Sequence, residues 1–192
     1  MNTNAPRLVL ASGSPRRREL LTKLGFEFVI HSSDVDETVE GLPQDMVRTL
    51  ALRKANATAN LETDGWIIAA DTLVALDDRA LGKPENAEDA KKMLRSLSGR
   101  SHDVFTGVCL MDAKTRKYDL RVVGSKVYFR VVTDDEIDEY IATGEPMDKA
   151  GAYAIQGIAS KFITGYDGSY ENIVGFPTQV FMEMYENFPT ML

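Results

Sequence analysis

Cysteine and histidine are scarce in this sequence. Cys109 is the only cysteine among 192 residues, so the chain can form neither an intramolecular disulfide nor a cage of thiolate metal ligands. It lies in the apolar run 108–111, which is typical of a small buried side chain. A cysteine nucleophile would also need a neighbouring base, and His31 and His102 are the only two histidines. The sequence therefore disfavours disulfide scaffolds, thiolate metal sites and cysteine chemistry.

Positive charge is also in the minority. The chain has 22 lysines and arginines against 29 aspartates and glutamates, which gives a formal net charge of −7. An acidic surface repels polyanions, so we expect neither nucleic acid nor a membrane surface as a partner. Any phosphate chemistry must then depend on a local basic cluster.

Long hydrophobic runs are absent as well. No apolar run approaches the ~20 residues that span a bilayer, and residues 1–6 lack the apolar core of a signal peptide. We therefore expect a cytoplasmic protein. The remaining composition, with 44% hydrophobic and 27% charged residues, is close to the globular average. This length predicts one domain over residues 1–192, either compact or with two lobes.

Strand and helix patterns alternate along the chain. Apolar and β-branched runs predict strands over 7–11, 26–31, 65–76, 102–112 and 117–130, the last two forming a hairpin. Helical spacing and capping residues predict helices over 15–24, 43–62, 86–97, 133–141 and 177–188. The stretch from 144 to 177 is rich in glycine and reads as turns between short strands. This alternation predicts an α/β protein with a mixed sheet.

Three arginines open the first predicted helix. They are Arg16–Arg18, directly after the turn 12–14 and with Ser14 as the expected N-cap. Positive side chains in the first turn oppose the helix dipole unless an anion binds there. The glycine spacing fits neither the dinucleotide fingerprint nor the P-loop. The arginines therefore indicate either a phosphate cradle of another kind or a solvated helix face.

A carboxylate in the middle of an apolar strand is the second candidate. Burying Asp71 is costly unless the side chain is paired, bound to a metal or used as a base. The acidic loop 33–38 could complete an oxygen ligand set with it, or could simply be solvated. Lys54 and Lys83 are basic counterparts that, taken singly, are equally typical of surface charge.

Five short motifs follow one another along the chain between residues 8 and 188. They are Ser-Gly-Ser-Pro-Arg-Arg-Arg-Glu-Leu at 12–20, Asp-Glu at 36–37, Ala-Asp-Thr at 70–72, Leu-Gly-Lys-Pro at 81–84 and the glycine-rich run 145–157. The first resembles the signature SxSPRRxEL of the Maf family of nucleoside triphosphate pyrophosphatases. The other four resemble the later motifs of that family, in its order, which makes the resemblance specific.

The resemblance implies a fold, a reaction and a set of site residues. The implied fold is a mixed twisted α/β sheet flanked by helices, with a central cleft, as in Maf and inosine triphosphatase proteins. The implied reaction converts a nucleoside triphosphate to the monophosphate and pyrophosphate, with a divalent cation (Mg²⁺, Mn²⁺ or Co²⁺), in a homodimer. Asp71 is implied as the proton acceptor, and Glu37 with Asp71 as the metal ligands. The implied catalytic residues are Asp71, Glu37, Lys54 and Lys83, and the implied substrate-binding and specificity residues are Ser12, Ser14, Arg16, Arg17, Thr72 and Gln156.

The choice of nucleotide follows from two of these positions. Thr72 and Gln156 resemble the branch of the family that acts on dTTP, UTP and modified pyrimidine nucleotides. The alternatives are the branch that acts on 7-methyl-GTP and a nucleotide-binding regulator of septation without turnover. One departure from the family is Ala154, which stands where glycine is usual and adds a methyl group close to Gln156.

Overall fold

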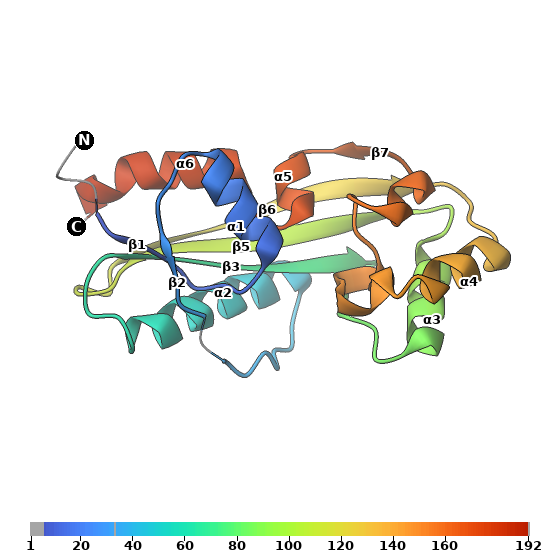
Figure 1. Cartoon of the computed structure of the whole chain (residues 1–192), viewed down its shortest axis with the longest axis horizontal. Helices are drawn as coiled ribbons and strands as arrows, with labels where there is room; N and C mark the ends of the chain where they lie inside the picture. The colour runs from blue at the N-terminus through green and yellow to red at the C-terminus, as the bar shows by residue number, and fades with distance from the viewer. Residues whose placement is uncertain (1–5, 33, 192) are drawn as a thin grey trace.

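Three long antiparallel strands form the centre of the molecule (Figure 1). They are β3 (Trp66–Leu76), β5 (Ser101–Asp112) and β6 (Tyr118–Phe129). The computed structural model describes residues 6–32 and 34–191. Over these residues seven strands form one sheet in the order β2-β1-β3-β5-β6-β7, with β4 paired to β3. The short strands are β1 (Leu8–Leu10), β2 (Val29–Ile30), β4 (Arg79–Leu81) and β7 (Ile163–Asp167).

The pairing confirms the expected α/β fold with a mixed sheet. β1 runs parallel to both of its neighbours, β2 and β3, and every other pairing is antiparallel. The helices that flank the sheet are α1 (Pro15–Lys23), α2 (Pro43–Ala59), α3 (Ala87–Leu97), α4 (Asp134–Ala142), α5 (Tyr170–Val174) and α6 (Thr178–Asn187).

Helices cover both faces of the sheet where its parallel strands lie. Successive strand residues point to opposite faces, so Ile67 and Cys109 join a core with α2, while Ile68 and Leu110 join one with α1 and α6. Figure 1 shows α2 on one side of the long strands and α6 on the other. Because both faces are covered, β3 reads as a nearly continuous apolar run.

A third core cluster fills the opposite end of the long strands. Val74 of β3 packs there with Leu94 of α3 and Tyr140 of α4. α3 and α4 lie side by side at this end of the molecule (Figure 1). The helix predicted over 86–97 begins at Ala87, with Asn86 as its N-cap, and the capping box expected at the start of α4 forms between Thr133 and Glu136.

The structure corrects several predicted boundaries. The helix predicted over 43–62 ends at Ala59, and the strand predicted over 26–31 is reduced to Val29–Ile30, an edge strand that pairs only with β1. Strand β4 has no clear signal in the sequence, because its hairpin turns through Asp77 and Asp78, two non-glycine residues with positive φ. The glycine-rich stretch, expected as turns between short strands, contains three short 3₁₀ turns, at Glu145–Asp148, Ala150–Ala152 and Ile158–Phe162, followed by β7 and α5.

One expectation about a single residue holds. Cys109 is fully buried, and burial raises the pKa of its thiol to about 12, which leaves it unreactive at neutral pH. Among the helices of the described residues, none has the length and apolar character needed to cross a bilayer.

Candidate active site

A cavity of about 830 Å³ lies where one edge of β3 has no neighbour. β1 pairs with β3 through Trp66–Ile68, and β4 pairs with it through Val74–Leu76. Between these stretches, no strand of the described part of the chain pairs with that edge of β3. Asp71 and Thr72 lie in this gap, and both line the cavity although they point to opposite faces of the strand.

All ten residues predicted for the site line this cavity. They come from the start of α1, the loop before α2, α2 itself, β3, the loop after β4 and the glycine-rich segment. They are Ser12, Ser14, Arg16, Arg17, Glu37, Lys54, Asp71, Thr72, Lys83 and Gln156. The fold therefore brings together side chains that are up to 144 positions apart in the sequence, from 12 to 156.

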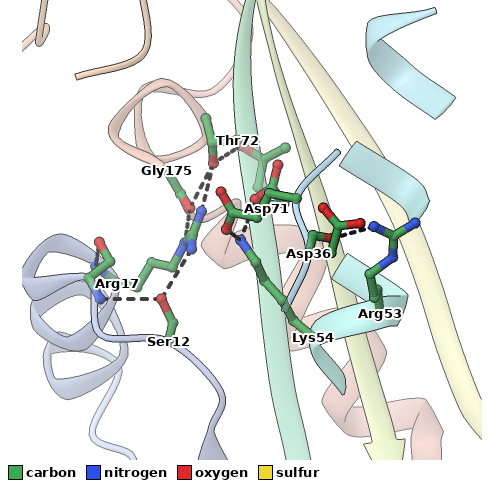
Figure 2. A network of polar contacts seen from close by, with 11 residues as sticks. Ser12, Arg17, Asp36, Arg53, Lys54, Asp71, Thr72 and Gly175 are labelled. Carbon is green, nitrogen blue, oxygen red and sulfur yellow. Dashed lines mark hydrogen bonds and ion pairs between the residues drawn. The ribbon is translucent and has the colours of Figure 1, made fainter. Parts of the chain in front are cut away.

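An ion pair holds Asp71 on the face of β3 that α2 covers (Figure 2). Lys54 of α2 donates from Nζ to Asp71 Oδ1 over 2.6 Å, and the same Nζ lies 2.7 Å from Glu37 Oε1. The Asp71 side chain is 10% exposed and that of Glu37 is 59% exposed. The hydrogen bond from Lys54 lowers the pKa of Glu37 below its usual value. One ammonium group thus joins a buried carboxylate to one that reaches solvent.

Hydrogen bonds from Arg17 fix Thr72 on the opposite face of β3 (Figure 2). Arg17 donates from Nη2 to Thr72 Oγ1 and from Nη1 to Ser12 Oγ, each over 3.1 Å. Its Nε donates to the Gly175 carbonyl over 3.0 Å. The Thr72 hydroxyl also shares a 2.9 Å hydrogen bond with Thr106 Oγ1. The same hydroxyl lies 3.3 Å from the Gly175 carbonyl, so contacts from three other segments hold Thr72 in one orientation.

The three arginines of the first turn of α1 have different surroundings. Ser14 caps the helix as predicted, with its side chain accepting from the Arg17 amide. Burial lowers the pKa of the Arg17 guanidinium, and the negative charge of Asp71 opposes that effect. Arg16 lines the cavity, whereas Arg18 is exposed and does not. The cradle interpretation suits the first two arginines, and the solvated-face interpretation suits Arg18.

Three of the predicted site residues have side chains without a hydrogen-bond or ion-pair partner within residues 6–32 and 34–191. They are Arg16, Lys83 and Gln156. A guanidinium and an ammonium group are donors that match phosphate oxygens, and an amide can both donate to and accept from a base edge. These three side chains are therefore available to a ligand.

Only one acidic side chain of the predicted loop reaches the cavity. Residue 33 lies outside the described residues. The Asp36 carboxylate accepts from the Thr38 amide over 2.9 Å, and Arg53 donates to the Asp36 carbonyl (Figure 2). Asp36 therefore makes its contacts within the loop and with Arg53. Glu37 is the carboxylate of this loop that forms the ion pair with Lys54.

The donor set of the cavity fits a divalent cation such as Mg²⁺. Asp71 and Glu37 supply hard oxygen ligands, and their carboxylates already share one cationic group, the Lys54 ammonium. Mg²⁺ is usually bound by one or two carboxylates together with water and substrate phosphates. The described residues contain no group of three or more His, Cys, Asp or Glu side chains that could hold a metal by themselves. A cation held by these two carboxylates would complete its coordination with water or substrate phosphate oxygens.

Three contributors to the site were not assigned from the sequence. Thr106 reads as an ordinary strand residue, and only its register opposite Thr72 brings the two hydroxyls together. Gly175 contributes a backbone carbonyl, for which no side-chain signal exists. Tyr153 lines the cavity within the glycine-rich run, where its aromatic ring reads as core.

Comparison with known proteins identifies the family. The family model described as Maf-like protein matches residues 7–188. The chain belongs to the Maf family. It is similar to proteins named dTTP/UTP pyrophosphatase from Pelotomaculum thermopropionicum (49% identity, covering 94% of this chain and 96% of the relative) and from Anaeromyxobacter dehalogenans (50%, covering 90% and 89%). A protein of the same name from Desulforamulus reducens is 49% identical and covers 88% of this chain and 90% of its own length.

Proposed function

We propose that this Maf-family chain is a hydrolase that converts dTTP, UTP and modified pyrimidine triphosphates to the monophosphate and pyrophosphate. The observation that carries the proposal is the ion-paired set Asp71, Lys54 and Glu37 in a cavity of about 830 Å³, a volume suited to a nucleotide. The names of relatives at 49–50% identity support this reaction and these substrates.

Asp71 acts as the proton acceptor in the proposed mechanism. A water molecule attacks the α-phosphorus, a bond forms between that phosphorus and the water oxygen, and the bond to the β-phosphate oxygen breaks. The water proton passes to the Asp71 carboxylate, and pyrophosphate leaves. Lys54 holds the carboxylate in place through its 2.6 Å bond to Oδ1, leaving Oδ2 for the water. No covalent intermediate is needed, because transfers at phosphorus depend mainly on positioning and electrostatics.

Positive groups offset the charge that develops on the phosphates. Lys83 and Arg16 have free donors at the cavity, and Lys54 adds a third positive charge. Ser12 and Ser14 lie at the start of α1, where backbone amides favour an anion. A divalent cation, when bound by Glu37 and Asp71, supplies further neutralisation of the phosphate oxygens.

Base selection falls to three cavity residues. Arg16 and Gln156 offer donors and an acceptor that have no competing partner among the described residues. Thr72 offers a hydroxyl whose direction is fixed by Arg17 and Thr106. An oriented set of this kind favours the carbonyl and imide groups of uracil and thymine over bases with a different donor pattern.

The proposed setting is a cytoplasmic homodimer that binds free nucleotides and neither nucleic acid nor membrane. Each chain would be one domain with two lobes around the cleft. Removal of modified nucleotides from the cellular pool is the role that fits this substrate range.

A nucleotide panel tests the proposed function. Pyrophosphate release is measured with Mg²⁺, Mn²⁺ and Co²⁺ in turn, for dTTP, UTP, dCTP, ATP, GTP and 7-methyl-GTP. We expect the highest kcat/KM for dTTP and UTP. A preference for 7-methyl-GTP would place the chain in the other branch of the family. Tight nucleotide binding without pyrophosphate release would instead support a regulator without turnover.

A further inference from the structure

The segment that carries Gln156 enters the cavity through strained backbone. Gly151 and Ala152 have φ values of 67° and 60°, in the left-handed region, and Ala152 is fully buried. A Cβ on Gly151 would come within 3.0 Å of the Val74 side chain. A left-handed alanine persists only where its surroundings hold it there. Contacts from the rest of the fold must therefore fix the conformation of residues 150–156.

Hydrogen bonds from backbone amides hold this segment on both sides of Gln156. The Gly151 amide donates to the Gly82 carbonyl over 3.0 Å, directly before Lys83. On the far side, the Glu145 carboxylate accepts from the Ile158 amide over 3.1 and 3.2 Å. The segment is thus coupled to the lysine loop. Because the Gln156 side chain has no partner in the described chain, its place in the cavity depends on this backbone.

A buried side-chain pair provides the third anchor. Tyr153, which lines the cavity, shares a 2.6 Å hydrogen bond between its hydroxyl and His102 Nε2 on β5. The two residues are 5% and 1% exposed. Both rings pack edge-on against Phe129, with centroids 4.9 and 5.1 Å from it. The pair joins the glycine-rich segment to one of the three long strands of the sheet.

A histidine at this buried position lowers the stability of the fold. Its Nδ1 is buried and has no hydrogen-bond partner in the described residues. Burial also lowers the pKa of His102 to about 4, so the ring is neutral near pH 7. An unpaired buried polar atom destabilises a fold, and an apolar ring would pack in the same aromatic cluster without that cost. Within the described residues, the one hydrogen bond that the imidazole makes is the bond to Tyr153.

We propose that His102 is a positioning residue for base recognition, which through the Tyr153 hydroxyl fixes residues 150–156 and hence the place of the Gln156 amide. His102 itself lies behind the cavity wall and touches no substrate. This inference rests on the proposed function. It predicts an effect on nucleotide affinity and base preference, with little effect on the proton transfer at Asp71, which lies on another strand.

Removing the hydrogen bond from either side tests the proposal. Tyr153→Phe keeps the ring and loses the hydroxyl, and His102→Phe keeps an aromatic ring and loses the imidazole nitrogens. Each is expected to raise KM for dTTP and UTP about tenfold, the effect of one net hydrogen bond, with kcat unchanged within about twofold. His102→Gln places an amide where Nε2 lies and is expected to restore most of the affinity.

Tyr128→Phe is the matched control. It loses an equally short hydrogen bond, 2.6 Å to Asp167 Oδ2, at a position that does not line the cavity, and is expected to keep the wild-type KM. An unchanged KM in Tyr153→Phe and His102→Phe would overturn the proposal. A lower thermal stability and a lower kcat with an unchanged KM would overturn it as well. If the wild type released no pyrophosphate, the proposed function would be wrong, but the positioning role could still be tested by binding. The Kd for dTTP, measured calorimetrically on the same variants, would then decide the positioning role by the same tenfold criterion.

Discussion

A single buried carboxylate carries the proposed chemistry. Asp71→Asn keeps the shape of the side chain and a hydrogen-bonding oxygen but removes the proton acceptor. We expect kcat to fall by about 10²–10⁴-fold while the Kd for dTTP stays within a few-fold of the wild type. Steady-state kinetics and calorimetry measure the two quantities separately. An unchanged kcat would assign proton removal to another group.

The orientation of the Asp71 carboxylate depends on Lys54. Lys54→Met removes the ammonium that lies 2.6 Å from Asp71 Oδ1 and 2.7 Å from Glu37 Oε1. Without this hydrogen bond, the carboxylate is no longer held in the position from which it accepts the water proton. We expect kcat to fall by about tenfold or more in steady-state kinetics. Lys92→Met, at an exposed position on α3, is the control and should keep the wild-type kcat. An unchanged kcat in Lys54→Met would contradict this role.

At the scale of elements, α2 approaches β5 too closely for any side chain at Gly107. A Cβ there would lie 2.3 Å from the Val47 carbonyl oxygen of α2. Gly107 is also the register partner of Asp71, so a shift of α2 would move Lys54 away from Asp71. We expect Gly107→Ala to lower the free energy of unfolding by about 1–3 kcal/mol and to reduce kcat.

Urea unfolding and kinetics of Gly107→Ala test the close approach, and another strand glycine provides the comparison. A Cβ on Gly165 of β7 would meet nothing within 4 Å, so Gly165→Ala should change neither stability nor kcat appreciably. Equal behaviour of the two alanine variants would mean that α2 adapts to the added methyl group without consequence.

Some features of the elements and of the site can be predicted from the sequence, and others cannot. Asp71 stands out because a carboxylate interrupts an apolar run, and the caps of α3 and α4 follow from local residue types. Thr106 does not stand out, because its contribution depends on the strand register that places it opposite Thr72. The bond from Gly151 to Gly82 likewise joins segments that only the folded sheet brings together. Local patterns therefore predict elements and chemistry-bearing residues, while contacts between distant segments require the tertiary structure.

Over the whole molecule, charge is distributed differently at the surface and in the cavity. The chain has a formal net charge of −7, yet four basic and three acidic residues line the cavity. The basic residues are Arg16, Arg17, Lys54 and Lys83, and the acidic residues are Glu37, Asp71 and Asp148. An acidic exterior disfavours long polyanions. This distribution of charge is compatible with the proposed binding of one free nucleotide in the basic cavity.

Stability of the whole molecule should depend on pH through His102. Burial lowers the pKa of this residue from 6.5 to about 4, and the charges of Asp103 and Lys126 have smaller, opposite effects. Between these two pH values the unfolded chain binds a proton that the folded chain does not. The free energy of unfolding therefore falls as pH decreases through this window, by up to about 3 kcal/mol.

Urea unfolding at pH 7, 5.5 and 4.5 measures this dependence. His102→Gln has no titrating ring, so its free energy of unfolding should change less than that of the wild type over the same interval. At lower pH, carboxylates with depressed pKa values control stability in both proteins. Glu62 is one of them, because its hydrogen bond from Arg7 lowers its pKa from 4.5 to about 2, and its contribution is lost as pH falls through that range. Parallel curves for the variant and the wild type between pH 7 and 4.5 would show that His102 is not the group responsible.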